Sequence, residues 1–130
     1  MVEGVVATMG VAHQLLEDAA TTARDHNEKM GWATFDPERF RDVLASLATI
    51  APAQVGDLRL VELLAAYPPL LRDAGNIAAA STRRGIGARE IGSGVWTVLH
   101  DAEQKSIGLY AEAGRILTLA QARRRRWMLW

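Results

Sequence analysis

The sequence contains no cysteine among its 130 residues. This absence excludes a disulfide framework, a thiolate nucleophile, a zinc site with cysteine ligands and an iron–sulfur cluster. Aromatic residues are also scarce, at 6% of the chain, so most of a core would be built from Ala, Leu, Val and Ile. The lack of cysteine agrees with a cytoplasmic protein, which is our expectation.

Long hydrophobic runs and strand-like alternation are missing as well. No segment reaches the roughly 18 uninterrupted apolar residues that a membrane-spanning helix needs. The opening stretch MVEGVVATMG has no basic residue and includes Glu3, so no classical signal peptide is expected and any export would need a non-classical route. Because β-branched residues never alternate with polar ones over a sustained stretch, we expect no sheet.

The composition that remains is that of one globular domain, with 49% hydrophobic and 23% charged residues. The net charge of zero conceals an asymmetry. Residues 1–82 carry 6 Lys/Arg and 11 Asp/Glu, whereas residues 83–130 carry 9 and 4. These opposite charges can attract each other within one molecule or head to tail between molecules.

Two helices are predicted in the first half of the chain. Apolar residues recur at spacings of three and four up to a stop at Gly31. The next helix would be capped by Asp36, start at Pro37, and be fixed by packing of Phe35 on Phe40. The expected inward residues are Val6, Met9, His13, Leu16, Ala20 and Ala23 in the first helix and Phe40, Val43, Leu44, Leu47 and Ile50 in the second, which Pro52 would end.

The second half predicts a short helix capped at Asp57 and stopped by Pro68 and Pro69, then a short or kinked helix after them. A long helix starts near Val95, with Ser93 as a cap. We therefore expect an all-α fold, a small bundle of four to five helices with a long C-terminal helix. Residues 1–122 would form the domain, and residues 123–130 a basic and aromatic tail. Inward positions of the later helices would be Leu60, Val61, Leu64, Tyr67, Leu70, Leu71, Ala74, Ile77, Ala78, Trp96, Leu99, Tyr110, Ala113, Leu117 and Ala120.

The stretch RRGIGAREIGSG (residues 83–94) holds four glycines and predicts a loop or hinge. A phosphate-binding loop is the alternative, but the Walker spacing is absent and no strand precedes it. A helix-turn-helix anchored by Ile91 and Val98 is a second alternative, although the seven-residue spacing leaves little room for its turn.

Histidines are the remaining candidates for chemistry. Of the three, only His13 clearly shares a helical face with an acid, Glu17 at i+4. This spacing does not match a di-iron bundle, so we predict no metal and no cofactor. No nucleophile elbow or triad pattern is recognisable, and an enzyme ranks last among the hypotheses, with His13, Glu17 and His100 as the residues to test.

The chain ends in RRRRWMLW, which contains Arg123, Arg124, Arg125 and Arg126 followed by Trp127 and Trp130. The arginines, with Arg83 and Arg84, could contact nucleic acid phosphates or an anionic membrane surface. The alternative is protein contact, in which the arginines complement the helix dipole and the tryptophans cover an apolar patch. The residues alone leave these readings open.

Two stretches resemble small helical proteins of the actinobacterial type VII secretion system, the secretion-associated substrates related to the Trp-X-Gly family. FDPERFRDVLASLA is similar to the start of their first helix, and LHDAEQKSIGLYAEAG to their last, and together they cover about a quarter of the chain. Tyr110 matches the tyrosine of the family's Tyr-x-x-x-Asp/Glu export signal, while Gly114 stands at the acidic position. The resemblance implies a helical hairpin that works by pairing with a partner and has no active site.

The leading hypothesis is a non-enzymatic helical interaction protein that self-associates or pairs with a helical partner, with a link to secretion from the resemblance. Gly108 and Gly114 support it, because each costs about 1 kcal/mol relative to Ala inside a helix. Such residues are better explained if another helix approaches closely there. The expected interaction residues are Tyr110, Gly108, Gly114, Trp96, Trp127 and Trp130. The alternative is a binder of nucleic acid or anionic membrane through the arginine cluster.

Overall fold

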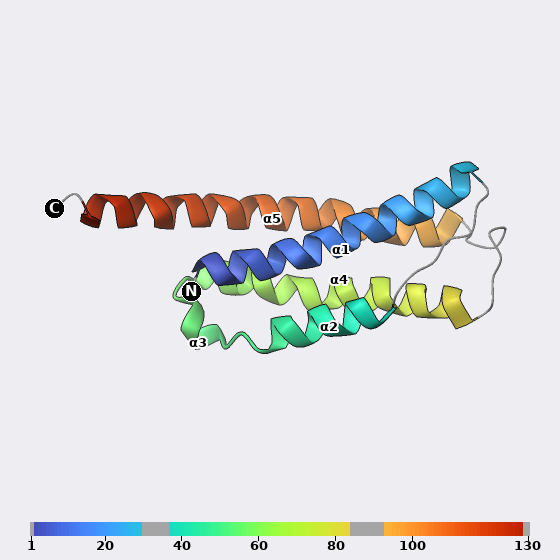
Figure 1. Cartoon of the computed structure of the whole chain (residues 1–130), viewed down its shortest axis with the longest axis horizontal. Helices are drawn as coiled ribbons and strands as arrows, with labels where there is room; N and C mark the ends of the chain where they lie inside the picture. The colour runs from blue at the N-terminus through green and yellow to red at the C-terminus, as the bar shows by residue number, and fades with distance from the viewer. Residues whose placement is uncertain (1, 30–36, 84–92, 129–130) are drawn as a thin grey trace.

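The computed structural model describes residues 2–29, 37–83 and 93–128, and these residues form five α-helices without a strand (Figure 1). The helices are α1 (Val2–Lys29), α2 (Pro37–Ala48), α3 (Pro52–Val55), α4 (Leu58–Arg83) and α5 (Ser93–Met128). The predicted all-α class and the long C-terminal helix are confirmed, because α5 alone spans 36 residues. None of the helices in these three ranges is long and apolar enough to cross a membrane.

The helices form an elongated bundle in which α1 and α4 each contact both α2 and α5. α1 and α5 run antiparallel along most of their length, and their contact is the most extensive in the bundle (Figure 1). The C-terminal end of α5 projects past the other helices. The helix continues without a break through the predicted boundary at residue 122 and includes all four arginines.

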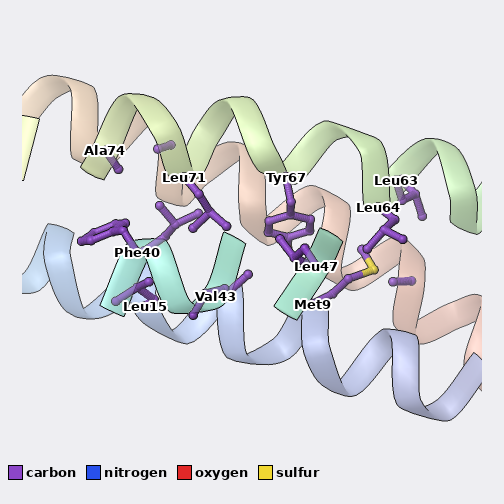
Figure 2. Packing of buried hydrophobic residues seen from close by; sticks show 14 of the residues in the cluster. Met9, Leu15, Phe40, Val43, Leu47, Leu63, Leu64, Tyr67, Leu71 and Ala74 are labelled. Carbon is purple, nitrogen blue, oxygen red and sulfur yellow. The ribbon is translucent and has the colours of Figure 1, made fainter. Parts of the chain in front are cut away.

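The core lies where the apolar stripes of the helices meet, and the sequence pattern placed most of it correctly. Ten of the predicted inward positions are only partly buried, and the side chain of Ala78 lies outside the described residues. The ten are His13, Leu44, Ile50, Val61, Leu70, Ile77, Trp96, Tyr110, Leu117 and Ala120. Figure 2 shows side chains of α2 between those of α1 and α4. The predicted positions that are buried include Val6, Met9, Leu16, Ala20, Ala23, Phe40, Val43, Leu47, Leu60, Leu64, Tyr67, Leu71, Ala74, Leu99 and Ala113.

The start of α4 is fixed by the cap that the sequence predicts. The Asp57 carboxylate accepts a hydrogen bond from the Leu60 backbone N–H at 2.9 Å, and thereby satisfies one of the donors at the helix start. Just before it, Gly56 adopts a left-handed backbone with φ of 76°, a conformation that glycine takes without steric cost. The chain can therefore turn directly from α3 into α4.

The predicted stop at Pro68 and Pro69 is wrong, because α4 runs through both prolines to Arg83. Neither proline can donate to the carbonyl four residues earlier, so the carbonyls of Leu64 and Ala65 lack their helical partners. Apolar packing on both sides of the prolines outweighs this loss. The buried residues keep one helical phase across the prolines, at Leu60, Leu64, Tyr67, Leu71 and Ala74.

Several other predictions concern the residues at which helices begin and end. α2 starts at Pro37 as expected and ends at Ala48, four residues before Pro52, which instead begins α3. α5 starts at Ser93, the residue predicted to cap it. Gly31, Phe35, Asp36 and most of the glycine-rich stretch, residues 84–92, lie outside the described residues.

Candidate functional site

The seam between α1 and α5 holds the best-connected polar cluster in the described part of the chain. Ser106 of α5 is fully buried, and its Oγ lies 2.7 Å from Nδ1 of His13 on α1 and 2.9 Å from the hydroxyl of Tyr67 on α4. On its other side, His13 Nε2 lies 3.4 Å from a carboxylate oxygen of Glu17. The side chains of three helices therefore meet here, with His13 of α1 and Tyr67 of α4 both in contact with Ser106 of α5.

These contacts fit one consistent direction of hydrogen bonding. If Tyr67 donates to Ser106, Ser106 donates to His13 Nδ1, and the Nε2–H of His13 points to Glu17, every polar hydrogen has an acceptor. Burial raises the pKa of the Tyr67 phenol above its ordinary value, while the hydrogen bond to Ser106 opposes this rise and the nearby Tyr110 phenol adds to it. Tyr67 thus stays protonated and available as the donor.

The cluster contains an acid, a histidine and a serine in line, the residue types of a hydrolase triad, and includes two of the three residues that the sequence offered for an enzyme. Its geometry does not favour that chemistry. Ser106 has 0% of its surface exposed, so a substrate carbonyl cannot reach its Oγ in this conformation. A satisfied polar cluster buried between helices instead fixes their register, because any shift leaves a polar group unpaired.

Tyr110 lies at this same seam. Its ring stacks on that of His13 with centroids 5.2 Å apart and planes 7° from parallel. It also lies against Gly10, where an added Cβ would be 2.9 Å from the tyrosine hydroxyl. Tyr110 is half-buried. Its main contacts are therefore made within the chain, to α1.

Trp96 and His100 pair with each other one turn apart on α5. Their rings stack with centroids 4.9 Å apart and planes 10° from parallel, and Trp96 also packs against the core. Among the described residues, the ring contact of His100 is thus with Trp96 and not with the cluster around His13. In the three described ranges no group of three His, Asp or Glu side chains could hold a metal ion.

Gly108 and Gly114 lie on a part of α5 that no other helix of the described chain approaches. A Cβ built at either position meets nothing within 4 Å, whereas Gly75 of α4 lies against Phe40 of α2, with 3.1 Å between the added Cβ and the Phe40 Cβ. Around the two glycines the helix shows a run of mostly exposed side chains, with Ile107 45% exposed. We call this the α5 outer face, and its residues are Gln104, Ile107, Gly108, Ala111, Gly114, Arg115 and Thr118.

The arginine cluster forms the last turns of α5. Arg124 donates to the Glu3 carboxylate of α1 at 2.8 Å, an intramolecular pair between the basic and acidic parts of the chain. Arg123, Arg125 and Arg126 are exposed and have no ion pair in the part of the chain that the structure describes. Because successive residues are about 100° apart on a helix, the four cations point in different directions.

The structure does not describe the side chains of the remaining residues that the sequence predicted as contacts. Trp127 belongs to α5 and Arg83 is the last residue of α4, but neither side chain is described. Arg84 and Trp130 lie outside the described residues. The structure therefore brings no second basic patch onto the arginine cluster among the residues it describes.

An ion pair between α4 and α5 has the opposite polarity to the overall charge asymmetry, because its cation lies in the acidic residues 1–82 and its anion in the basic residues 83–130. Arg59 donates two hydrogen bonds to Glu112, at 2.6 and 3.0 Å, and a third to Glu62 at 2.8 Å. The bonds from Arg59 hold the pKa of the Glu112 carboxyl below its ordinary value, although partial burial opposes this effect. The bidentate geometry joins the start of α4 to the middle of α5.

An apolar cleft lies between α2 and α4, with a volume of about 420 Å³. Sequence reasoning missed it, because a cleft depends on how two helices pack. Its lining residues are Leu44, Ala45, Leu47, Ala48, Pro52, Val61, Leu64, Ala65, Pro68 and Arg72. Three of the lining residues are alanines, whose small side chains leave room that larger ones would fill.

Comparison of the chain with protein-family models, with curated proteins and with solved structures found no match. Any functional proposal therefore depends on the residues and geometry described above.

Proposed function

We propose that the protein is a non-enzymatic helical interaction protein, and that the α5 outer face pairs with a helix of another chain, either a second copy or a different protein. The observation that carries this proposal is the open space at Gly108 and Gly114. A glycine inside a helix costs about 1 kcal/mol relative to alanine. Nothing in the described part of the chain uses the closeness that these two glycines permit.

The surroundings of the glycines support a partner helix. Ile107 exposes 45% of its surface beside Gly108, and Leu119, further along α5, exposes 59%. A helix that lies across Gly108 would bury Ile107 and approach the α5 backbone closely, as Phe40 does at Gly75. The C-terminal turns of α5 that project past the bundle offer more of the same helix to a partner (Figure 1).

The test is a bulky substitution on the α5 outer face. Gly108→Leu fills open space, so the monomer should remain folded, but a partner helix could no longer approach. Gly4→Leu in α1 is the matched control, because Gly4 is also exposed and an added Cβ there meets nothing within 4 Å. Circular dichroism verifies that both variants are folded.

Sedimentation velocity at micromolar concentration measures self-association, and a native-lysate pull-down with wild type and both variants as baits measures pairing with another protein. We expect the association, or one captured protein, to be lost with Gly108→Leu and kept with Gly4→Leu. The proposal would be contradicted if the wild-type protein is a monomer in sedimentation and also captures the same proteins as Gly108→Leu in the pull-down.

A second candidate function is supported by Arg123, Arg125 and Arg126, which are exposed and have no ion pair in the described ranges. In this alternative the end of α5 binds nucleic acid or an anionic membrane. Binding to a DNA oligonucleotide or to anionic vesicles would then weaken steeply with salt, and replacing the four arginines by Gln should abolish it. Binding that is insensitive to both changes would exclude this candidate.

We also propose that the protein resides in the cytoplasm, and that export by a type VII-like route is the alternative supported by the resemblance around Tyr110. Fractionation of the native host with an antibody would distinguish the two. The protein in the culture filtrate, and its loss there with Tyr110→Ala, would favour export.

A further inference from the structure

The cleft between α2 and α4 is a separate feature from the α5 outer face. We propose that it binds a free amphiphile with one acyl chain and an anionic head group, such as a fatty acid. The carboxylate would lie at Arg72 and the chain would follow the cleft toward Pro52. This inference goes beyond the proposed pairing function and does not depend on it.

The lining of the cleft is suited to an acyl chain. Its lining includes the buried side chains of Leu47 and Leu64 and the half-buried side chains of Leu44 and Val61. Figure 2 shows Leu47 and Leu64 among the core side chains. The volume of about 420 Å³ lies within the usual range for small-molecule sites, which are mostly apolar with few polar groups.

The shape of the cleft favours a long, narrow ligand. α2 and α4 run antiparallel, so residues late in α2 and in α3 lie beside residues early in α4 (Figure 1). Pro52 and Val61 therefore lie toward one end of the cleft, and Leu44 and Arg72 toward the other. Val61 and Arg72 are separated by about 16 Å along the helix axis, at 1.5 Å per residue.

The charge at one end of the cleft determines which head group the ligand carries and how the ligand is oriented. Arg72 is the one charged residue that lines the cleft, it is exposed, and it has no ion pair with any described residue. A guanidinium at the rim of an apolar surface pairs well with a carboxylate, which accepts two parallel hydrogen bonds from it. This complementarity favours an anionic amphiphile over a neutral or a cationic one.

Isothermal titration calorimetry with dodecanoate, dodecan-1-ol and dodecyltrimethylammonium, each below its micelle concentration, tests the proposal. We expect dodecanoate to bind best with one site per chain. Arg72→Gln should weaken dodecanoate about five-fold, the factor of a partly exposed charge-assisted hydrogen bond, and leave dodecan-1-ol unchanged. Lys105→Gln on α5 is the matched charge control and should change neither.

A second variant tests the place of the acyl chain. Ala65→Leu fills the cleft from an exposed position, so the fold should persist while binding of dodecanoate falls at least ten-fold. Ala7→Leu, an exposed alanine of α1 outside the cleft, should bind as wild type does. Equal affinity for the three probes, or binding unaffected by Ala65→Leu, would overturn the proposal. Loss of self-association with Ala65→Leu in a protein that binds no dodecanoate would also overturn it, and would assign the cleft to a second copy.

Discussion

The Tyr110 ring lies directly over Gly10, at a point where α1 and α5 could not be so close if residue 10 had a side chain. A Cβ at position 10 would be 2.9 Å from the Tyr110 hydroxyl and 3.1 Å from the nearest ring carbon. A movement of the ring away from position 10 would disturb its stacking on His13. The close approach of Tyr110 to Gly10 is therefore one of the contacts that hold together the two helices with the largest contact.

Gly10→Ala should lower the free energy of unfolding by about 1 kcal/mol, because the overpacking outweighs the gain in helix propensity. Gly4→Ala, in open space on the same helix, should instead raise it by up to about 1 kcal/mol. Urea unfolding followed by circular dichroism measures both. If the two variants are stabilised equally, the contact between Gly10 and Tyr110 does not restrict the helix spacing.

Ser106→Ala should lower the free energy of unfolding by about 1–3 kcal/mol, because it leaves His13 Nδ1 without its partner and the Tyr67 hydroxyl with only a 3.3 Å contact to the backbone carbonyl of residue 106. The control is Ser46→Ala, an exposed serine of α2 that bonds its own helix and should change stability by less than about 0.5 kcal/mol. A double-mutant cycle with Tyr67→Phe should show coupling between the two hydroxyls. Additive effects would mean that the two groups do not interact.

The stability of the protein should fall as the pH rises above about 10. The pKa of Tyr67 is raised in the folded state, so between the unfolded and folded pKa values the unfolded chain binds fewer protons than the folded one. Unfolding free energy then decreases with pH in that window. Urea titrations from pH 9 to 11 should show a steeper decline for wild type than for Tyr67→Phe, and parallel curves would contradict the prediction.

Pro69→Ala should raise the free energy of unfolding by about 1 kcal/mol. The change restores a backbone donor for the Ala65 carbonyl and removes a residue that is costly inside a helix, although the unfolded chain regains some freedom. Pro69 is exposed, so little packing is lost. Thermal unfolding measures the effect. A lower midpoint would show that the bundle depends on the shape that the two prolines give α4.

The prolines also show how far the sequence could predict this fold. The start of α2 at Pro37 and the cap at Asp57 depend on neighbouring residues, and both were predictable. The prediction that Pro68 and Pro69 stop the helix failed, because it considers only the hydrogen bonds that the prolines remove. It does not consider the apolar packing of the residues on both sides of them. A signal was present, since Leu60, Leu64, Tyr67, Leu71 and Ala74 follow one uninterrupted pattern of fours and threes, which a true break would not preserve.

The polar cluster could be predicted only in part. His13 and Glu17 are one helical turn apart, so their pairing follows from spacing, and it is confirmed. Ser106 lies 93 residues from His13 and 39 from Tyr67, and nothing local marks it as a buried residue. Such contacts depend on helix packing, which a single sequence with no matched relative does not provide.

The antiparallel pairing of α1 with α5 has a consequence during synthesis on the ribosome. α1 is made before α5, yet its most extensive contact is with that helix, which begins at Ser93. Tyr67 of α4 likewise depends on α5, since its hydroxyl contacts Ser106. Until α5 has emerged, the nascent chain carries an uncovered apolar stripe that is prone to aggregation. The interval between translation of residue 29 and residue 128 is therefore when this chain exposes most of the apolar surface that the finished bundle covers.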